Sequence, residues 1–333
     1  MIRVNGPGGL VKVQTTCRIC RSEGENTVYT IPEMQFGTRE KFDYFQCESC
    51  KCLQIANIPK DLSQYYPSDY ESLRSLAGEP PHMTKLKTRL DRRRVRYALT
   101  GRGLLGRVLY LRKPDPALKS LSLVNMSENT RVLDVGCGTG HLLYCLRRAG
   151  FCHVMGVDPF INRDIEYSNG LRIKKCALGT LSGCWDIIMF HHSFEHVPDA
   201  RSTLLHVKER LSSGGACLLR IPTCESWAWK HYREYWAQAD APRHVYLHSK
   251  KSISVLANET GMTVEGFVYD STEFQFLASE LYSRGISWKE APTRPDVSHL
   301  FERANVEQLR RRAARLNALR QGDQFVCILR KAA

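Results

Sequence analysis

The sequence predicts an α/β protein, with a mostly parallel sheet covered by helices on both faces and a small β module at the N-terminus. From Arg131 onward, short apolar runs alternate with helical stretches, which is typical of parallel strands joined by crossover helices. Residues 12–56 carry paired cysteines and look β-like, with no long helical pattern. We expect residues 57–127 to form a mostly helical connector and residues 128–333 to form the main domain.

The composition supports a packed soluble core. The chain has 333 residues, of which 43% are hydrophobic and 25% charged, enough for one large domain and a small module. Its 13 cysteines are scattered and odd in number, which suits reduced thiols and metal ligands better than disulfides. No stretch resembles a signal peptide or a membrane-spanning helix, so we expect a cytoplasmic protein.

The whole chain has a net charge of +14, and its positive charge is concentrated in two segments. Residues 85–119 hold twelve Lys or Arg against two Asp, and residues 310–320 add five Arg. Such segments favour anionic partners, namely phosphates, an anionic membrane surface contacted peripherally, or nucleic acid; they equally suit solvated helix faces. Neither segment interleaves aromatic residues with its charges, which makes nucleic acid the less favoured partner.

The expected strands and helices of the main domain follow one another in order. "RVLDVG", "HVMGVD", "WDIIMFHH" and "ACLLRIP" read as strands, and "HLLYCLRRAG" and "DARSTLLHVKERLSSGG" as helices ended by glycine. "MTVEGFVYD" and "FVCILRKAA" are two further strands with a long helical stretch between them. This order suggests an antiparallel edge to the sheet.

The loop after the first of these strands carries the pattern Asp-x-Gly-x-Gly-x-Gly. Gly136 and Gly138 permit backbone angles closed to other residues and leave room for a ligand beside the main chain. Asp158 ends the next strand, 22 residues after Gly136, where an acid is placed to hold ribose hydroxyls. The glycine spacing differs from the dinucleotide-binding pattern.

These paired motifs, with "SFEHVPD" after the "WDIIMFHH" strand, resemble the class I S-adenosylmethionine-dependent methyltransferases over residues 128–333. The resemblance implies a Rossmann-like sheet and S-adenosylmethionine as cofactor. It implies that Asp134 orients the cofactor's amino group and that Asp158 binds its ribose. The implied cofactor-binding residues are Asp134, Gly136, Cys137, Gly138, Gly140, Asp158, Pro159, Phe160 and His191.

Two C-x-x-C pairs, separated by 26 residues, predict a structural Zn²⁺ site in the N-terminal module. Four thiolates leave no open coordination position, so the metal is expected to hold the fold. Four unrelated buried thiols are the alternative. The expected ligands are Cys17, Cys20, Cys47 and Cys50.

This module, followed by "YYPSDYES" and the methyltransferase motifs, resembles a bacterial group of sugar and polysaccharide methyltransferases that includes the deoxysugar C-methyltransferases. The resemblance implies that Tyr65, Tyr66 and Tyr70 close over cofactor and substrate; packing of the module onto the main domain is the alternative. The resembled C-methyltransferases carry an additional C-terminal domain. This chain ends directly after its last expected strand, so we expect O-methylation to be favoured over C-methylation.

Residues 222–250 are rich in aromatic side chains, Trp236 among them, and are expected to form a lid over the substrate. Aromatics that anchor a helix to the core are the alternative. Within this segment, His244 matches the histidine base of the resembled enzymes, whereas Arg243 replaces a glutamate. An arginine there suits a phosphate or carboxylate of the substrate.

The segment after the "WDIIMFHH" strand holds a second group of candidates, which includes His191 and His192; a role in shaping the loop is the alternative for Glu195 and His196. The candidate catalytic residues are His244, then His196, and Glu195. The candidate substrate residues are Tyr66, Tyr70, His192, Trp236 and Arg243.

The expected function is methyl transfer from S-adenosylmethionine to a hydroxyl or carbon of an activated, phosphate-bearing sugar, a glycan or a natural-product intermediate. The sulfonium methyl is already electrophilic, so the enzyme mainly aligns the nucleophile and a histidine removes its proton. A zinc-containing RNA methyltransferase is the alternative. The intact glycine loop and Asp158 argue against a scaffold without activity.

Overall fold

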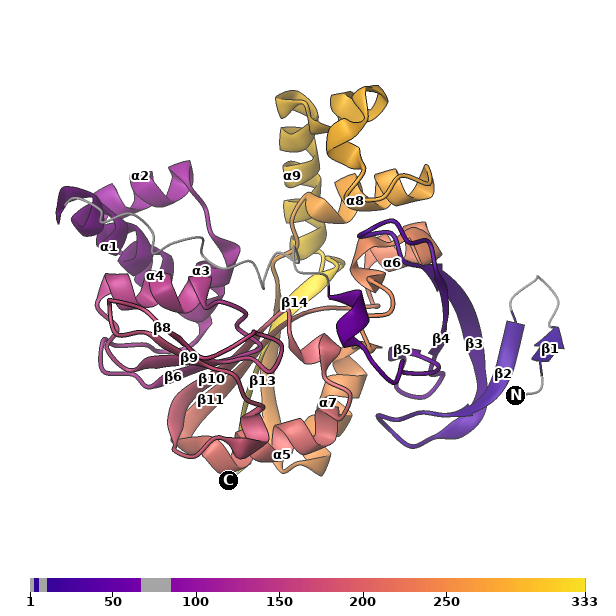
Figure 1. The fold of residues 1–333 in the computed structure, drawn as a ribbon, viewed down its shortest axis with the longest axis horizontal. Coiled ribbons are helices and arrows are strands. Elements are labelled where there is room, and N and C mark those ends of the chain that lie inside the picture. The colour runs from indigo at the N-terminus through magenta and orange to yellow at the C-terminus, as the bar shows by residue number, and fades with distance from the viewer. Residues whose placement is uncertain (1–2, 6–10, 67–84, 333) are drawn as a thin grey trace.

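A computed structural model describes residues 3–5, 11–66 and 85–332 of the chain. These residues form two β-sheets and the helices around them (Figure 1). The strands of the six-stranded sheet are β1 (Arg3–Asn5), β2 (Val11–Thr16), β3 (Glu23–Pro32), β4 (Lys41–Gln46), β5 (Leu53–Ile55) and β12 (Tyr246–Leu247). Those of the eight-stranded sheet are β6 (Val132–Val135), β7 (Val154–Val157), β8 (Ile165–Glu166), β9 (Arg172–Lys174), β10 (Trp185–His191), β11 (Leu211–Pro222), β13 (Met262–Tyr269) and β14 (Gln324–Lys331).

The helices lie around and between the two sheets. The α-helices are α1 (Lys85–Thr100), α2 (Leu104–Arg112), α3 (Pro116–Ser120), α4 (His141–Ala149), α5 (Ala200–Arg210), α6 (Trp227–Tyr232), α7 (Lys250–Glu259), α8 (Phe274–Ser283) and α9 (Arg303–Ala318). Short 3-10 helices are η1 (Ser63–Tyr65), η2 (Leu121–Leu123), η3 (Leu178–Thr180), η4 (Phe194–His196), η5 (Arg233–Tyr235), η6 (Ala237–Ala239), η7 (Ala291–Thr293) and η8 (Pro295–Phe301). None of the described helices combines the length and the apolar character needed to cross a bilayer.

The eight-stranded sheet has the order β13-β14-β11-β10-β6-β7-β9-β8. Its central strands β11, β10, β6, β7 and β9 are parallel, as their alternation with helices predicts. Strand β14 runs antiparallel between β11 and β13, so the predicted antiparallel edge is confirmed. The predicted α/β fold class is confirmed as well.

Helices cover both faces of this sheet (Figure 1). Alternate residues of β10 point to opposite faces: Met189 packs into a core that includes Leu143 of α4, and Phe190 into a core that includes Leu204 of α5. Helices α1 and α4 therefore lie on one face, and α5 and α7 on the other. All these side chains are completely buried.

The N-terminal module is joined to the main domain through a shared sheet. Strand β12, which begins two residues after His244, pairs antiparallel with β5, placing Tyr246 opposite Gln54 and Leu247 opposite Leu53. The sequence indicated a separate module and gave no sign of this pairing, because β12 is only two residues long. The sheet of the module therefore includes a strand of the main domain that lies next to His244, a predicted catalytic residue.

The predicted lid, residues 222–250, is packed between the two sheets. Trp229 and Trp236 are each 1% exposed, and the Trp229 ring meets Tyr29 of β3 edge to face at 4.9 Å. Beyond this segment, α8 and α9 stand over the carboxyl end of the sheet (Figure 1), and their core includes Met34 of the module. The anchoring alternative fits this arrangement better than a mobile lid.

Candidate functional site

The glycine loop turns sharply from β6 into α4. Gly136, Gly138 and Gly140 all have positive φ angles of +72°, +55° and +80°, a region that L side chains rarely adopt. A Cβ on Gly136 would lie 2.5 Å from Cβ of Ser193, and one on Gly140 2.5 Å from Cδ1 of Ile173. The backbone therefore favours glycine at all three positions, and close neighbours also restrict a Cβ at Gly136 and Gly140.

Asp158, directly after β7, holds this loop in place. Its Oδ2 accepts a hydrogen bond from the Gly138 N–H and its Oδ1 one from the Phe160 N–H, both at 2.8 Å. Each carboxylate oxygen has a second lone pair, so Asp158 can still accept from a ligand hydroxyl. Asp134 is 3% exposed and its Oδ1 has no partner among the described residues. Burial, and then Asp158, raise the pKa of Asp134 well above its usual value.

Further polar residues continue from Asp134 along the same face of the sheet. Strand pairing places Asp134 beside Met189 and His191 beside Arg220, so Asp134, His191 and Arg220 point the same way. Both ring nitrogens of His191 are buried without a hydrogen-bond partner among the described residues, and burial lowers the pKa of His191 well below its usual value. Buried polar atoms normally have partners, so this row suits a polar ligand or ordered water.

A second polar cluster brings His244 to the segment that holds His192, Glu195 and His196, which lies 48 or more positions earlier in the chain. The Nε2 of His244 lies 3.9 Å and the Nδ1 of His192 3.4 Å from Oε1 of Glu195, which is completely buried. The His196 and His244 rings are 4.7 Å apart. Burial raises the pKa of Glu195, but the nearby His192, His244 and His196 outweigh burial and lower it to about 2. Glu195 is therefore an ionised carboxylate among three histidines.

The hydrogen bonds of the two inner histidines fix their tautomers. His244 Nδ1 lies 2.7 Å from the carbonyl oxygen of Gln238, and His196 Nδ1 lies 2.9 Å from that of Arg243. A carbonyl only accepts, so each Nδ1 carries the proton and each Nε2 keeps a lone pair. Burial, and then His244, lower the pKa of His196, which favours its neutral form.

Tyr66 connects this histidine cluster to the glycine-loop side of the site. Its hydroxyl lies 3.0 Å from Nδ1 of His196, and its ring stacks on Phe160 with centroids 5.1 Å apart. Tyr65 points elsewhere, because its hydroxyl donates to Glu40 in the module. Tyr70 lies outside the described residues.

Arg243 and Trp236, both expected to meet substrate, are instead enclosed by protein. Arg243 is 1% exposed, and its guanidinium donates to Glu33, to both oxygens of Asp240 and to the Tyr65 carbonyl. The Trp236 indole donates to the buried carboxylate of Asp323 over 3.2 Å. Both side chains therefore have protein partners in a segment packed between the two sheets, and their contact with substrate stays a prediction.

The four module cysteines meet at one point, as their spacing predicts. All four Sγ atoms lie within 4.8 Å of one another, with Cys17 and Cys50 at 3.6 Å and Cys20 and Cys47 at 3.6 Å. Four sulfurs about 2.3 Å from a tetrahedral Zn²⁺ would be about 3.8 Å apart. Gln54 Nε2 donates to the Cys17 sulfur, as a group beside a thiolate would. The residues present therefore fit a structural zinc ion.

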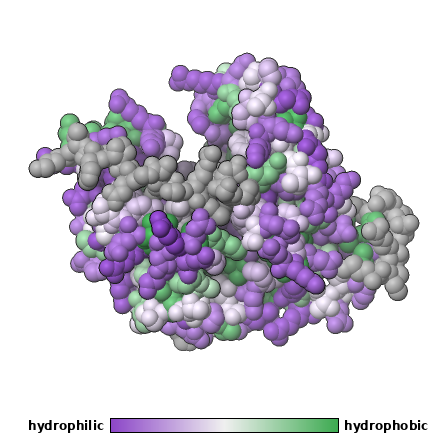
Figure 2. All heavy atoms as spheres, viewed as in Figure 1, coloured by the Kyte–Doolittle hydropathy of each residue, from purple (hydrophilic) through white to green (hydrophobic). Residues whose placement is uncertain are grey.

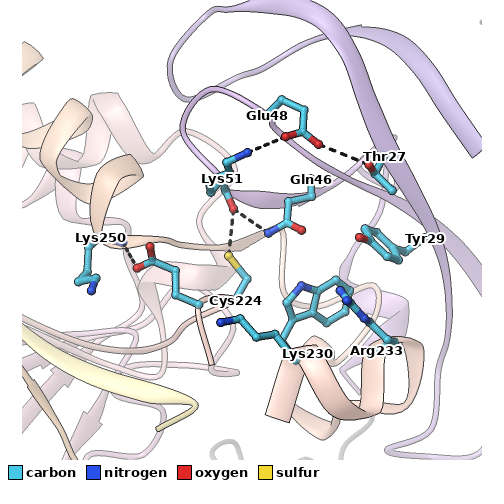
Figure 3. Close-up of a pocket in the computed structure, with 11 residues that line it drawn as sticks. Thr27, Tyr29, Gln46, Glu48, Lys51, Cys224, Lys230, Arg233 and Lys250 are labelled. Carbon is cyan, nitrogen blue, oxygen red and sulfur yellow. Dashed lines mark hydrogen bonds and ion pairs between the residues drawn. The ribbon is translucent and has the colours of Figure 1, made fainter. Parts of the chain in front are cut away.

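A separate pocket of about 510 Å³ lies between the module and α6 (Figure 3). Lys51 is paired with Glu48 at its upper edge, and the Lys250 backbone N–H donates to Glu225. Arg233 lies over the Tyr29 and Trp229 rings without an ion-pair partner among the described residues. The pocket shares no residue with the glycine loop or the histidine cluster.

Sequence reasoning missed the buried partners of Arg243, His244 and Trp236. Glu33 and Asp240 hold Arg243, Gln238 orients His244, and Asp323 receives Trp236. Lone acids and amides in loops carry no pattern by themselves. The one available signal was a charged pair, Asp240 and Arg243, three positions apart inside a strongly aromatic segment.

A search of curated proteins finds no match. Among solved structures, an S-adenosylmethionine-dependent methyltransferase from Mesorhizobium loti is 15% identical, with 66% of this chain and 99% of that chain covered and a TM-score of 0.40. The O-methyltransferase of a trans-AT PKS multienzyme from Brevibacillus brevis is 14% identical, with 76% and 82% covered and a TM-score of 0.40.

The family comparison is decisive. Residues 97–265, half of the chain, match the family described as a methyltransferase domain. The matched range contains the glycine loop, Asp158 and the Glu195–His196 segment. The chain therefore belongs to this methyltransferase family and is an S-adenosylmethionine-dependent enzyme.

Proposed function

We propose that this methyltransferase acts on a hydroxyl, or a carbon, of an activated sugar, a glycan or a natural-product intermediate. The observation that carries the proposal is Tyr66, which contacts Phe160 beside the donor loop and His196 in the histidine cluster. This contact supports a single site that holds both the proposed donor residues and the proposed proton-accepting residues. A hydroxyl acceptor needs both a methyl donor and a group that removes its proton.

The donor would be held by the residues around the glycine loop. Asp134 Oδ1 and the His191 ring are buried without partners among the described residues, which leaves them available to the polar end of S-adenosylmethionine. Asp158 has lone pairs for the ribose hydroxyls. When bound, the cofactor supplies an electrophilic sulfonium methyl group.

His244 is the proposed base for the acceptor. Its Nδ1 proton is held by Gln238, so the lone pair on Nε2 can accept the proton of an acceptor hydroxyl. Glu195 and Asp240 lie 3.9 and 3.8 Å from that nitrogen and would stabilise the resulting imidazolium. His196 is the second candidate, oriented by Arg243 and next to Tyr66.

The proposed zinc ion would stabilise the module that supports this base. The Tyr44 hydroxyl of β4 donates to the His244 carbonyl over 2.8 Å, and β5 pairs with β12 just after it. The four cysteines leave no open ligand position, so the metal has a structural role. Loss of the metal is expected to disturb His244 through these contacts.

Methyl transfer from labelled S-adenosylmethionine, screened against nucleotide sugars, tests the proposal. Transfer to at least one nucleotide sugar is expected. In His244→Asn we expect the turnover to fall by about 10²–10⁴, the usual contribution of a general base, with donor affinity unchanged. His206→Asn, on the exposed side of α5, is the matched control. Transfer to RNA but to no nucleotide sugar would overturn the acceptor class.

A further inference from the structure

Helix α2 carries an apolar stripe that faces solvent. Leu104, Val108 and Leu111 recur at the i, i+4, i+7 spacing of one helix face and are 83%, 48% and 64% exposed. The opposite side of the helix packs against α1, where a Cβ on Gly106 would lie 2.5 Å from the Arg93 carbonyl oxygen. Large apolar side chains side by side on a surface mark an interaction site.

Arginines border this stripe on both sides. On a helical projection, Arg107 lies on one flank of the stripe and Arg112 on the other, and both are exposed. Neither has an ion-pair partner among the described residues. Figure 2 shows this surface of α2 at the upper left of the molecule, where hydrophobic side chains lie beside hydrophilic ones.

The second basic segment differs from α2 in its contacts. On α9, Arg310 pairs with Glu273 and Arg312 covers the Trp227 ring at 4.2 Å, so these arginines are used within the protein. Within the part of the chain that the structure describes, Arg107 and Arg112 of α2 have no such ion pair or ring contact. Exposed leucines flanked by long cationic side chains are what an anionic bilayer surface accepts, because the leucines enter the acyl boundary and the arginines meet the headgroups.

We propose that α2 docks this protein onto anionic lipid bilayers, with Leu104, Val108 and Leu111 inserted and Arg107 and Arg112 on the headgroups. This inference rests on α2 alone and does not depend on the acceptor. It accounts for the position of α2 at the edge of the molecule (Figure 1).

Co-sedimentation with phosphatidylcholine vesicles, with and without phosphatidylglycerol, tests the proposal on the full chain. We expect binding that requires phosphatidylglycerol and weakens with salt. We expect the double variant Leu104→Ser/Leu111→Ser to lose about tenfold or more in vesicle affinity, and Arg107→Gln/Arg112→Gln to lose the preference for the anionic lipid.

The controls remove equivalent groups elsewhere on the surface. Leu205→Ser/Leu319→Ser removes two exposed leucines, and Arg303→Gln/Lys60→Gln removes two exposed cations. Both controls should bind as the wild type does. Absence of vesicle binding, or equal binding by all variants, overturns the proposal. A dimer in light scattering that Leu104→Ser/Leu111→Ser dissolves, without vesicle binding, would also overturn it and make α2 an interface between copies.

Discussion

Arg243→Leu is the substitution that separates a structural role of Arg243 from a substrate-binding one. The guanidinium makes three hydrogen bonds to carboxylates, one to Glu33 at 2.8 Å and two to Asp240 at 3.0 and 2.6 Å. The Arg243 and Glu33 side chains are each 1% exposed. Leucine leaves Glu33 buried without a cation, so the free energy of unfolding should fall.

The size of this loss of stability depends on the hydrogen bonds that Glu33 still accepts in Arg243→Leu. Removing one partner of a buried ion pair typically costs about 3–5 kcal/mol. Glu33 still accepts hydrogen bonds from the Phe36 and Thr38 backbone and from the Thr38 hydroxyl, which partly stabilise its charge. We therefore expect a loss near the lower end, about 3 kcal/mol.

Urea unfolding of the zinc-loaded protein measures this loss. Arg284→Leu, which breaks an exposed pair with Glu280, is the matched control and should cost below about 1 kcal/mol. A double-mutant cycle with Glu33→Gln should show that the two substitutions together cost less than their sum. Unchanged stability in Arg243→Leu would refute the buried network and return Arg243 to the substrate side.

Two further predictions concern the metal and the pH dependence of stability. Elemental analysis should find about one zinc per chain, lost in Cys17→Ser and kept in the exposed control Cys152→Ser; a folded, metal-free wild type would contradict the zinc site. Burial raises the pKa of Asp323 from 3.8 to about 6, so its folded state binds a proton more tightly than its unfolded state does. Stability from Asp323 is thus full below about pH 4 and is lost as the pH rises through about 6, by up to about 3 kcal/mol. Asp323→Asn should flatten this part of the curve in urea unfolding at a series of pH values, and an unaltered curve would rule out Asp323 as its source.

The sequence predicted those parts of the structure that depend on local pattern. The strands around Val132 and Ile187, the turn at Gly136 and the meeting of Cys17 with Cys50 all follow from periodicity, backbone restriction or ligand spacing. Each of these is set by interactions within a few residues or by a repeated motif. They could therefore be read before any tertiary contact was known.

The parts that sequence reasoning missed depend on contacts between distant segments. Arg243 meets Glu33 across 210 residues, and Tyr66 meets His196 across 130. Trp236 was expected at a substrate surface because aromatic residues suit both pockets and cores. Only the packing of β12 against β5 decides that its segment lies between two sheets.

The central claim is that the loop between β6 and α4, together with Asp158, binds the methyl donor. Calorimetric titration with S-adenosylhomocysteine, the product that the donor becomes when it loses its methyl group, tests it most directly, because this product cannot react. One site per chain is expected in the wild type, with binding lost in Asp158→Ala and retained in Asp164→Ala, an exposed acid nearby. Equal affinity of Asp158→Ala and the wild type, with both proteins folded, would contradict the account.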